Sequence, residues 1–175
     1  MHPSQAGTAH LDLTADFHQI SARPSTFDFQ TFDRTVTILP MVSIDIVYEG
    51  QLHCHATHGP SGQTLTTDAP VDNKGRGESF SPTDLVATAL ASCMATIMGL
   101  QADTLGIDIT GMSIRIEKIM ATDTPRRIAK LPLQITMPIP HDPKTAIIME
   151  RAAKTCPVHH SLHPDIEVPI EFIWK

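Results

Sequence analysis

A long stretch without charge places the strongest constraint on how this chain can fold. No charged side chain occurs from Leu85 to Leu100, and Ser81-Pro82-Thr83-Asp84 directly precedes the stretch. A serine at the N-cap, a proline at the first helical position and an acid three residues after the cap are together typical of a helix start. Gly106 can end the helix in the left-handed conformation. The sequence therefore predicts one long apolar helix over residues 81–106.

This apolar stretch is too short to be a strong candidate for a membrane span. It falls below the roughly 20 apolar residues that cross a bilayer, and it contains Thr88, Ser92 and Thr96. We therefore expect a buried core helix. The first 35 residues also lack the basic segment and continuous apolar run of a secretory signal. These features predict a soluble, cytoplasmic protein with no membrane partner.

Periodicity and turn residues predict strands on both sides of the helix. Apolar residues spaced mostly by two run from Val36 to Thr57, with a turn at Glu49-Gly50 and a short third strand at 63–67. Downstream of the helix we expect a long strand at 107–119, an antiparallel partner at 128–139, helices at 143–154 and 157–162, and a closing strand at 166–174. Pro132 and Pro138 should place the 128–139 strand at a sheet edge or interrupt it.

The order of these elements predicts an α+β fold in which antiparallel sheets pack on the long helix. A length of 175 residues suits one domain, which we place at residues 36–175. Residues 1–35 show no clear periodicity and are predicted to form an N-terminal arm or extension. The net charge of −6 excludes the basic surface that nucleic acids and anionic lipids require.

Three cysteines, Cys54, Cys93 and Cys156, are too few and odd in number for a disulfide scaffold. Free or redox-active thiols are the better interpretation. Cys93 shares one helical stripe with Leu85, Ala89, Thr96 and Leu100, which we expect to face the interior. A buried cysteine in such a stripe can simply fill space.

Cys156 precedes Pro157, which places it at the start of a helix. Backbone amides and the positive end of the helix dipole would lie near its sulfur and lower the pKa of the thiol. His159 and His160 follow closely and could add positive charge. An inert residue at a helix start is the alternative interpretation.

Cys54 lies between His53 and His55, with His58 nearby. If the segment is a strand, His53 and His55 point to one face, while Cys54 and His58 point to the other. Either side could offer two ligands to zinc, although the spacing matches no common structural zinc pattern. A solvated strand end explains the same residues without a metal.

Two segments together resemble the cysteine motifs of the OsmC/Ohr family, which includes osmotically inducible protein C and organic hydroperoxide resistance proteins. The first is Ser81-Pro82-Thr83-Asp84-Leu85-Val86-Ala87-Thr88-Ala89-Leu90-Ala91-Ser92-Cys93, and the second is Ala153-Lys154-Thr155-Cys156-Pro157-Val158-His159. The resemblance covers roughly residues 42–174. Within the family, the chain is similar in particular to the less characterised OsmC-like branch.

The resemblance implies an intertwined homodimer with long central helices and active sites at the subunit interface. It also implies a thiol peroxidase in which Cys93 attacks an organic hydroperoxide and becomes a sulfenic acid. Cys156 would then form a disulfide with Cys93, which a dithiol reductant reopens. No cofactor or metal is implied. The family further supplies an arginine to hold the thiolate and a glutamate to orient that arginine.

The chain departs from the family at both supporting positions. Thr83 stands where the family has its glutamate, with Asp84 one position later and Glu78 in the preceding loop. The turn between the first two strands has no arginine. Arg76, in the glycine-flanked loop before the long helix, is the candidate for the missing cation. Arg126 or Arg127 could reach a site only from elsewhere in the dimer.

Three functions are compatible with these residues. The first is thiol-dependent reduction of organic hydroperoxides in oxidative stress defence, with Cys93, Cys156, Arg76 and Glu78 as site residues. The second is a redox or small-ligand binding protein with little peroxidase turnover. The third is a metal-binding protein that uses Cys93, Cys156 and nearby histidines.

Overall fold

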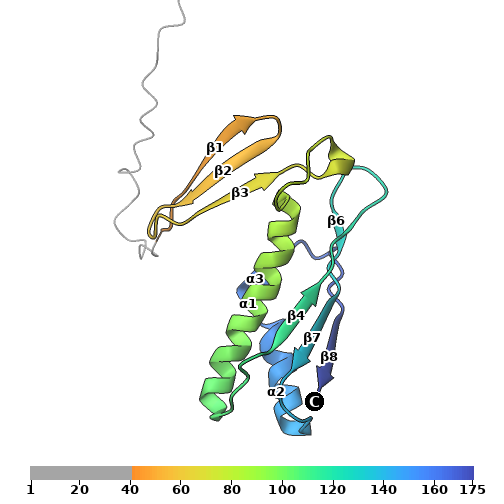
Figure 1. The fold of residues 1–175 in the computed structure, drawn as a ribbon. Helices are drawn as coiled ribbons and strands as arrows, with labels where there is room; N and C mark the ends of the chain where they lie inside the picture. Colours follow the sequence, from red (N-terminus) through yellow and green to blue (C-terminus); the bar gives the residue numbers. More distant parts are fainter. Residues whose placement is uncertain (1–40) are drawn as a thin grey trace, which may run out of the picture. The chain divides into compact units, whose positions relative to one another are not determined.

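The computed structural model describes residues 41–175 of the chain (Figure 1). The predicted N-terminal arm, residues 1–35, lies outside the described residues. So do Val36 and Ile38, which began the first predicted strand.

Three antiparallel strands form the first sheet, in the order β1-β2-β3. They are β1 (Ile44–Gly50), β2 (His53–His58) and β3 (Thr64–Asp68). Gly50, Gln51 and Leu52 all have positive φ angles and turn the chain from β1 into β2, as the Glu49-Gly50 pair predicts. One face of this sheet carries apolar side chains that remain exposed, which the alternating pattern alone does not predict. The most exposed are Ile44, Ile46, Tyr48 and Leu65.

The long helix α1 (Pro82–Leu105) has the ends that the sequence predicts. The Ser81 hydroxyl accepts a hydrogen bond from the Asp84 amide, and the Asp84 carboxylate accepts one from the Ser81 amide. Gly106 adopts the left-handed conformation at the other end. By length and composition alone α1 could cross a membrane. Core helices pass the same test, so this is weak grounds for a membrane span.

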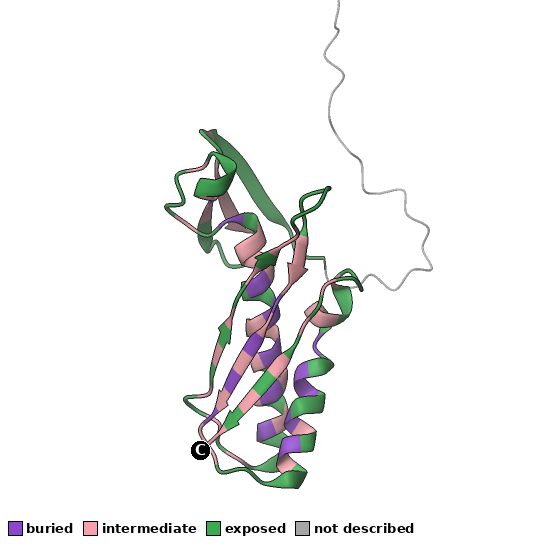
Figure 2. Ribbon diagram, turned by 90° about the vertical axis from the view of Figure 1, so that its right-hand side faces the viewer, coloured by how far each residue is buried: buried purple, intermediate pink, exposed green. Residues whose placement is uncertain are grey.

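The predicted stripe on α1 is not the one that the protomer buries. Ala89, Thr96 and Leu100 are exposed, and Leu85 and Cys93 are half-buried. The reason is that α1 is apolar around most of its circumference, so periodicity cannot select the face that packs on α2 (Pro143–Lys154) and β4 (Ser113–Ile116). The side chains that are buried instead are Ala87, Leu90, Met94, Met98 and Ala102 (Figure 2).

The second sheet has the order β4-β7-β8. It consists of β4 (Ser113–Ile116), β7 (Leu133–Met137) and β8 (Ile170–Trp174), while β5 (Ile119–Met120) and β6 (Ile128–Lys130) form a separate hairpin. Strands β4 and β7 are antiparallel, but β7 and β8 are parallel. The parallel pair is possible because α2 and α3 (Pro157–Ser161) provide the long crossover connection that it needs.

The two long strands predicted after α1 are each broken in the structure. Residues 107–112 form no strand, and β4 and β5 are separate. Pro132 interrupts the predicted partner strand between β6 and β7. The resulting β7 is the central strand of its sheet rather than an edge strand, because the interrupting proline lies outside its ladder.

Helices α2 (Pro143–Lys154) and α3 (Pro157–Ser161) precede β8, close to their predicted positions. A short 3₁₀ turn, η2 (Val71–Asn73), lies in the loop before α1. Helix α2, helix α1 and the inner face of β7 enclose the hydrophobic core (Figure 2). The predicted α+β arrangement of sheets on a long helix is therefore confirmed. Cys156 belongs to this core, and Cys93 packs against it.

Candidate active site

Cys93 lies midway along α1, at the border between the buried and the exposed side of the helix. Its neighbour Met94 is fully buried, whereas Ser92 is exposed. Among residues 41–175 no lysine, arginine or histidine makes a hydrogen bond or ion pair with Cys93. The thiol is thus half-accessible and has apolar surroundings within one protomer.

Cys156 is the N-cap residue of α3 and is completely buried. Its sulfur accepts a hydrogen bond from the backbone amide of His159, 3.3 Å away. Burial raises the pKa of the Cys156 thiol, and the His159 amide opposes this rise without reversing it. The sequence-based expectation of a lowered pKa is therefore wrong. The five-residue helix α3 contributes only a small dipole, and burial outweighs it.

The two thiols are neighbours in the folded protomer and are not bridged. Besides burial, the Cys93 side chain raises the pKa of Cys156, through a hydrogen bond between the two thiols and through the negative charge that Cys93 carries when it is ionised. The second half of α1, four strands and α2 separate the cysteines in the sequence, so only tertiary packing of α3 on α1 brings them together. This arrangement can support formation of a disulfide.

Arg76 and Glu78 form an ion pair with each other, in the loop before α1. Arg76 Nε lies 3.5 Å from Glu78 Oε2, and both side chains are at least half exposed. The Glu78 amide donates a hydrogen bond to the buried carboxylate of Asp68. Within residues 41–175, neither Arg76 nor Glu78 forms a hydrogen bond or ion pair with Cys93 or Cys156. A single protomer thus does not bring the two predicted supporting residues to the thiols.

Lys118 is the residue that the structure adds at the N-terminus of α1. Its ammonium group donates hydrogen bonds to Thr83 Oγ1 at 2.9 Å, Ser81 Oγ at 3.2 Å and Asp84 Oδ1 at 2.5 Å. Lys118 lies more than thirty residues away in the sequence, so no local motif could have revealed it.

Both carboxylate oxygens of Asp84, the acid one position after the expected glutamate, belong to this network. One carboxylate oxygen accepts from Lys118 and the other from the Ser81 amide. Burial on its own would raise the pKa of Asp84, but the hydrogen bonds from Lys118 and Ser81 outweigh it and lower the pKa. Asp84 therefore acts as a structural cap for α1.

Arg126 and Arg127, the two other arginines considered from the sequence, lie beside Thr83. They line a hollow of about 440 Å³ together with Thr83, Tyr48 and Cys54. Thr83 and Arg127 also line a second, mostly apolar hollow of about 420 Å³. The position of the missing glutamate thus has two guanidinium groups nearby.

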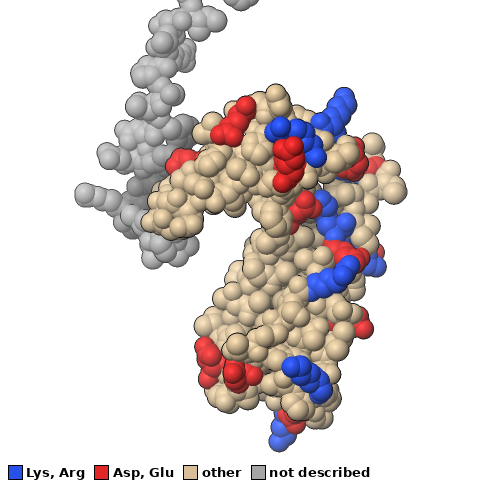
Figure 3. Space-filling model, viewed as in Figure 1, with Lys and Arg blue, Asp and Glu red and all other residues tan. Residues whose placement is uncertain are grey.

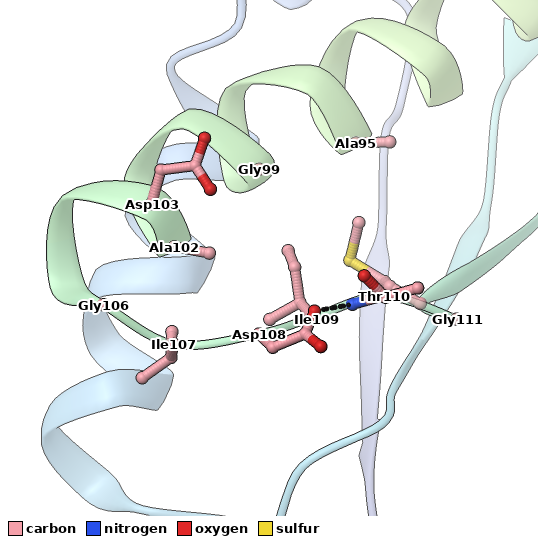
Figure 4. A pocket seen from close by; sticks show the side chains of 11 residues that line it. Ala95, Gly99, Ala102, Asp103, Gly106, Ile107, Asp108, Ile109, Thr110 and Gly111 are labelled. Atoms are coloured by element: carbon pink, nitrogen blue, oxygen red, sulfur yellow. Dashed lines mark hydrogen bonds between the residues drawn. The ribbon is translucent and has the colours of Figure 1, made fainter.

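A larger hollow of about 640 Å³ lies at the other end of α1 (Figure 4). Its walls come from the last turns of α1 and from the following loop, and they include Asp103 and Asp108. The Asp108 carboxylate accepts a hydrogen bond from the Thr110 amide. Neither Cys93 nor Cys156 lines this hollow, so we do not assign the thiol chemistry to it.

The structure does not support the metal-binding alternatives. In the described part of the chain, no three side chains of the types His, Cys, Asp and Glu come close enough together to hold a metal ion. His58 instead pairs with Ser61 through a 2.6 Å hydrogen bond, and His53 lies 3.7 Å from Glu49.

Comparison with known proteins assigns the family. The family model for OsmC-like proteins matches residues 75–171. This chain belongs to the OsmC-like family. A solved structure from Psychrobacter arcticus 273-4, provisionally described as an osmotic stress induced and detoxification response protein, is 44% identical to it. That match covers 78% of this chain and 99% of the other, with a TM-score of 0.73.

More distant structures share the OsmC-like fold. An organic hydroperoxide resistance protein OsmC from Legionella pneumophila is 15% identical, with a TM-score of 0.65 over 77% of this chain and 98% of that one. An organic hydroperoxide resistance protein from Elizabethkingia anophelis, with thiocyanate bound, is 14% identical. Its TM-score is 0.66, and the match covers 80% of this chain and 100% of that one. A search of curated proteins found no match. Family membership points to a role related to peroxides or stress.

Proposed function

We propose that this OsmC-like protein is a thiol-dependent reductase of organic hydroperoxides that works as a homodimer. The observation that carries the proposal is the unbridged pair of neighbouring thiols, one half-accessible and one buried with a raised pKa. These two environments suit two different chemical roles. Cys93 is the nucleophile, and Cys156 is the resolving thiol.

In the first step the Cys93 thiolate attacks one oxygen of the hydroperoxide, and the O–O bond breaks. The sulfur is oxidised to a sulfenic acid, and the other oxygen leaves as an alkoxide that takes up a proton to give the alcohol. The Cys156 thiol then attacks the Cys93 sulfur. A disulfide forms, and the hydroxyl group leaves with the Cys156 proton as water.

A dithiol reductant completes the cycle by reducing the Cys93–Cys156 disulfide. Two thiols of the protein are regenerated, and the reductant leaves as its own disulfide. Because burial raises the pKa of Cys156, this thiol keeps its proton until the sulfenic acid forms. It therefore does not compete with Cys93 for the peroxide.

The surroundings of the pair favour an organic substrate over hydrogen peroxide. Ile97, Val158 and Leu162 are partly buried side chains packed against the same core as both cysteines. Aliphatic walls of this kind bind an alkyl tail through the hydrophobic effect. The organic hydroperoxide resistance proteins among the structural neighbours support the same substrate class.

One observation favours a second candidate, a redox or ligand-binding protein with little turnover. Within the described residues of one protomer, neither Arg76 nor Glu78 contacts Cys93, so nothing there stabilises a thiolate in apolar surroundings. The two candidates differ in what they predict for repeated turnover with a dithiol.

A thiol titration before and after one equivalent of cumene hydroperoxide, with the disulfide mapped by mass spectrometry, tests the proposal. We expect the loss of two thiols, a Cys93–Cys156 bridge, and sustained peroxide consumption once a dithiol is added. Cys93→Ser should abolish consumption, and Cys156→Ser should allow a single round of oxidation that stops at the sulfenic acid. Bridge formation without turnover would favour the second candidate, and full turnover by Cys93→Ser would overturn the assigned nucleophile.

A further inference from the structure

The two thiols of the proposed pair differ in how far a second reactant can reach them. Cys93 is half-buried, and its neighbour Ser92 on α1 is exposed. Cys156 has no exposed surface and belongs to the same cluster of fully buried residues as Met94 and Met149. In the proposed function a dithiol must reduce the Cys93–Cys156 disulfide, so it must reach one of these two sulfurs.

The chemistry of disulfide reduction fixes the direction from which the reductant must come. A thiolate attacks one sulfur of the disulfide, and the other sulfur leaves. The attacking sulfur enters in line with the bond that breaks, on the side opposite to the leaving sulfur. Attack on Cys156 therefore needs free space behind Cys156, whereas attack on Cys93 needs free space on the side of Cys93 that faces away from Cys156.

The fold closes the space around Cys156. The residue is the N-cap of α3, its sulfur accepts a hydrogen bond from the His159 amide at 3.3 Å, and α3 packs on α1. A mixed disulfide on Cys156 would have to place the body of the reductant inside this core, and close-packed cores have no room for an added group. Attack on Cys156 would therefore require α3 to open first.

The far side of Cys93 needs an opening in any case if the proposed function holds. The hydroperoxide must reach Cys93 in the assembled protein, and it leaves one oxygen on the sulfur. When Cys156 displaces this oxygen as water, it enters from the opposite side. The position that the oxygen vacates is therefore the position from which a sulfur nucleophile can attack Cys93 in line with the Cys93–Cys156 bond.

We propose, on the basis of the proposed function, that the reductant attacks Cys93 and not Cys156, through the same opening that admits the hydroperoxide. One thiolate of the dithiol forms a bond to the Cys93 sulfur, and the Cys93–Cys156 bond breaks with its electron pair passing to Cys156. The second thiolate of the dithiol then attacks the reductant sulfur and expels Cys93. The dithiol is oxidised to its cyclic disulfide, and the protein regains two thiols.

This order returns each thiol in the state that the next cycle needs. Cys156 leaves first and takes up a proton, because burial raises the pKa of its thiol. Cys93 leaves last, as a thiolate that faces the opening for the hydroperoxide. A raised pKa makes Cys156 the poorer leaving group of the two. Access to the sulfur, and not the strength of the leaving group, therefore decides the direction of attack.

The first test maps the mixed disulfide. Cys54→Ser protein, which retains only the two cysteines of the pair, is bridged with diamide, so that the disulfide forms without peroxide. It is then treated briefly with 2-mercaptoethanol, quenched with acid, alkylated and analysed by mass spectrometry. We expect at least about ten times as much adduct on Cys93 as on Cys156, because only Cys93 is accessible. Adduct mainly on Cys156 would overturn the inference.

2-Mercaptoethanol suits this experiment because it is small and carries no charge besides that of its thiolate. Helix α1 has no charged residue between Asp84 and Asp103. In Figure 3 the surface along this part of α1 is a wide area without charged side chains. The position of the adduct therefore reports access to the two sulfurs and not attraction of a charged probe to the surface.

The second test asks whether attack needs α3 to open. Ser161→Gly removes a hydroxyl that donates to the Pro157 carbonyl at 2.9 Å and gives the backbone more freedom, so it loosens α3 from its exposed end. Dithiothreitol should reduce the diamide-bridged variant within about twofold of the wild-type rate, because Cys93 lies outside α3. Ser161→Ala, which keeps the helix propensity, is the matched control. Clear acceleration in Ser161→Gly alone would indicate attack on Cys156 and overturn the inference.

A third test concerns the shared opening. 2-Phenyl-2-propanol, the alcohol that cumene hydroperoxide yields, resembles the substrate but cannot oxidise a thiol. At the concentration that halves peroxide consumption, it should also halve the rate at which dithiothreitol reduces the bridged protein. Reduction of hydroxyethyl disulfide in solution, which involves no protein site, is the control and should be unaffected. Inhibition of peroxide consumption alone would show that the reductant uses a different path.

The outcomes separate this inference from the proposed function. If the bridged protein gives the Cys93 adduct but wild type consumes no peroxide, the proposed reductase fails and the assignment of the attacked sulfur stands. If wild type consumes peroxide but the adduct forms on Cys156, the inference alone fails. If diamide does not bridge Cys93 and Cys156, the inference also fails, because there is no such disulfide to reduce.

Discussion

The two sheets of this protein use similar apolar sequences in opposite ways. Strand β7 buries Leu133, Ile135 and Met137 against the helices. Strand β1 carries Ile44 and Ile46 on one face, yet these side chains are 60% and 67% exposed. The second sheet therefore completes its own core, whereas the first presents an apolar face that the described chain leaves uncovered.

This contrast shows which half of the molecule depends on another layer. An exposed apolar face of this kind marks an interaction site, and the exposed side of α1 has the same character. We expect a second copy of the chain to cover both in the proposed dimer. The first sheet would then be completed by association, and the second by folding alone.

The largest effect on stability is expected in the core that the second sheet forms with the helices. Leu90→Ala removes a fully buried side chain between α1 and its neighbours and should lower the free energy of unfolding by about 2–5 kcal/mol. Chemical denaturation measures the loss. Ile147→Ala, on the exposed side of α2, is the control and should change stability far less. Equal losses would contradict the location of the core.

The next prediction concerns the first sheet. Ile46→Asp places a charge on its apolar face and should weaken self-association at least tenfold, about 1.4 kcal/mol, because the charge must be desolvated. Sedimentation velocity over a dilution series measures the effect. Val47→Asp changes the neighbouring residue, which is similarly exposed on the opposite face, and should leave association unchanged. Unchanged self-association in both variants would show that neither face is an interface.

A smaller effect is expected where Lys118 joins the strands to the start of α1. Lys118→Met removes three hydrogen bonds and should lower the melting temperature by a few degrees at pH 7. The pKa of Asp84 is lowered in the folded state, so its contribution is present above the ordinary value of 3.8 and is lost as pH falls through the lowered one. The difference in melting temperature between wild type and Lys118→Met should therefore shrink in acid.

Thermal unfolding of wild type and Lys118→Met between pH 7 and pH 2 measures this convergence. Ser81→Ala is a useful companion, since it removes the cap hydroxyl but leaves the Asp84 charge and should keep most of the pH dependence. A deficit that grows as pH falls would contradict the role assigned to the Lys118–Asp84 pair.

The smallest effect is expected for the ion pair that links the β5–β6 hairpin to η2. Arg126 Nη2 lies 2.8 Å from Asp72 Oδ2, and both side chains are about half exposed or more. Solvent screens such pairs, so Asp72→Asn should leave the melting temperature almost unchanged. A clear drop would show that this contact, rather than an added layer, fixes the first sheet.

Local sequence alone was sufficient to predict the helices. The caps of α1 at Ser81 and Gly106 act through hydrogen bonds within a few residues, as does the Asp142 cap of α2, so spacing predicts them directly. The pair Cys93 and Cys156 emerged from the sequence through family resemblance. Its roles remain predictions, although the structure brings the two thiols together.

Only the tertiary structure decided which surfaces and charges surround those residues. Helix α1 is apolar on nearly all sides, so packing and not periodicity selected the stripe that contains Met94. The raised pKa of Cys156 follows from burial in the core, and the position of Lys118 follows from the path of the strands. Such effects join residues far apart in the sequence. The sequence by itself therefore determined where helices begin and end and which thiols to examine, while long-range packing determined what each thiol faces.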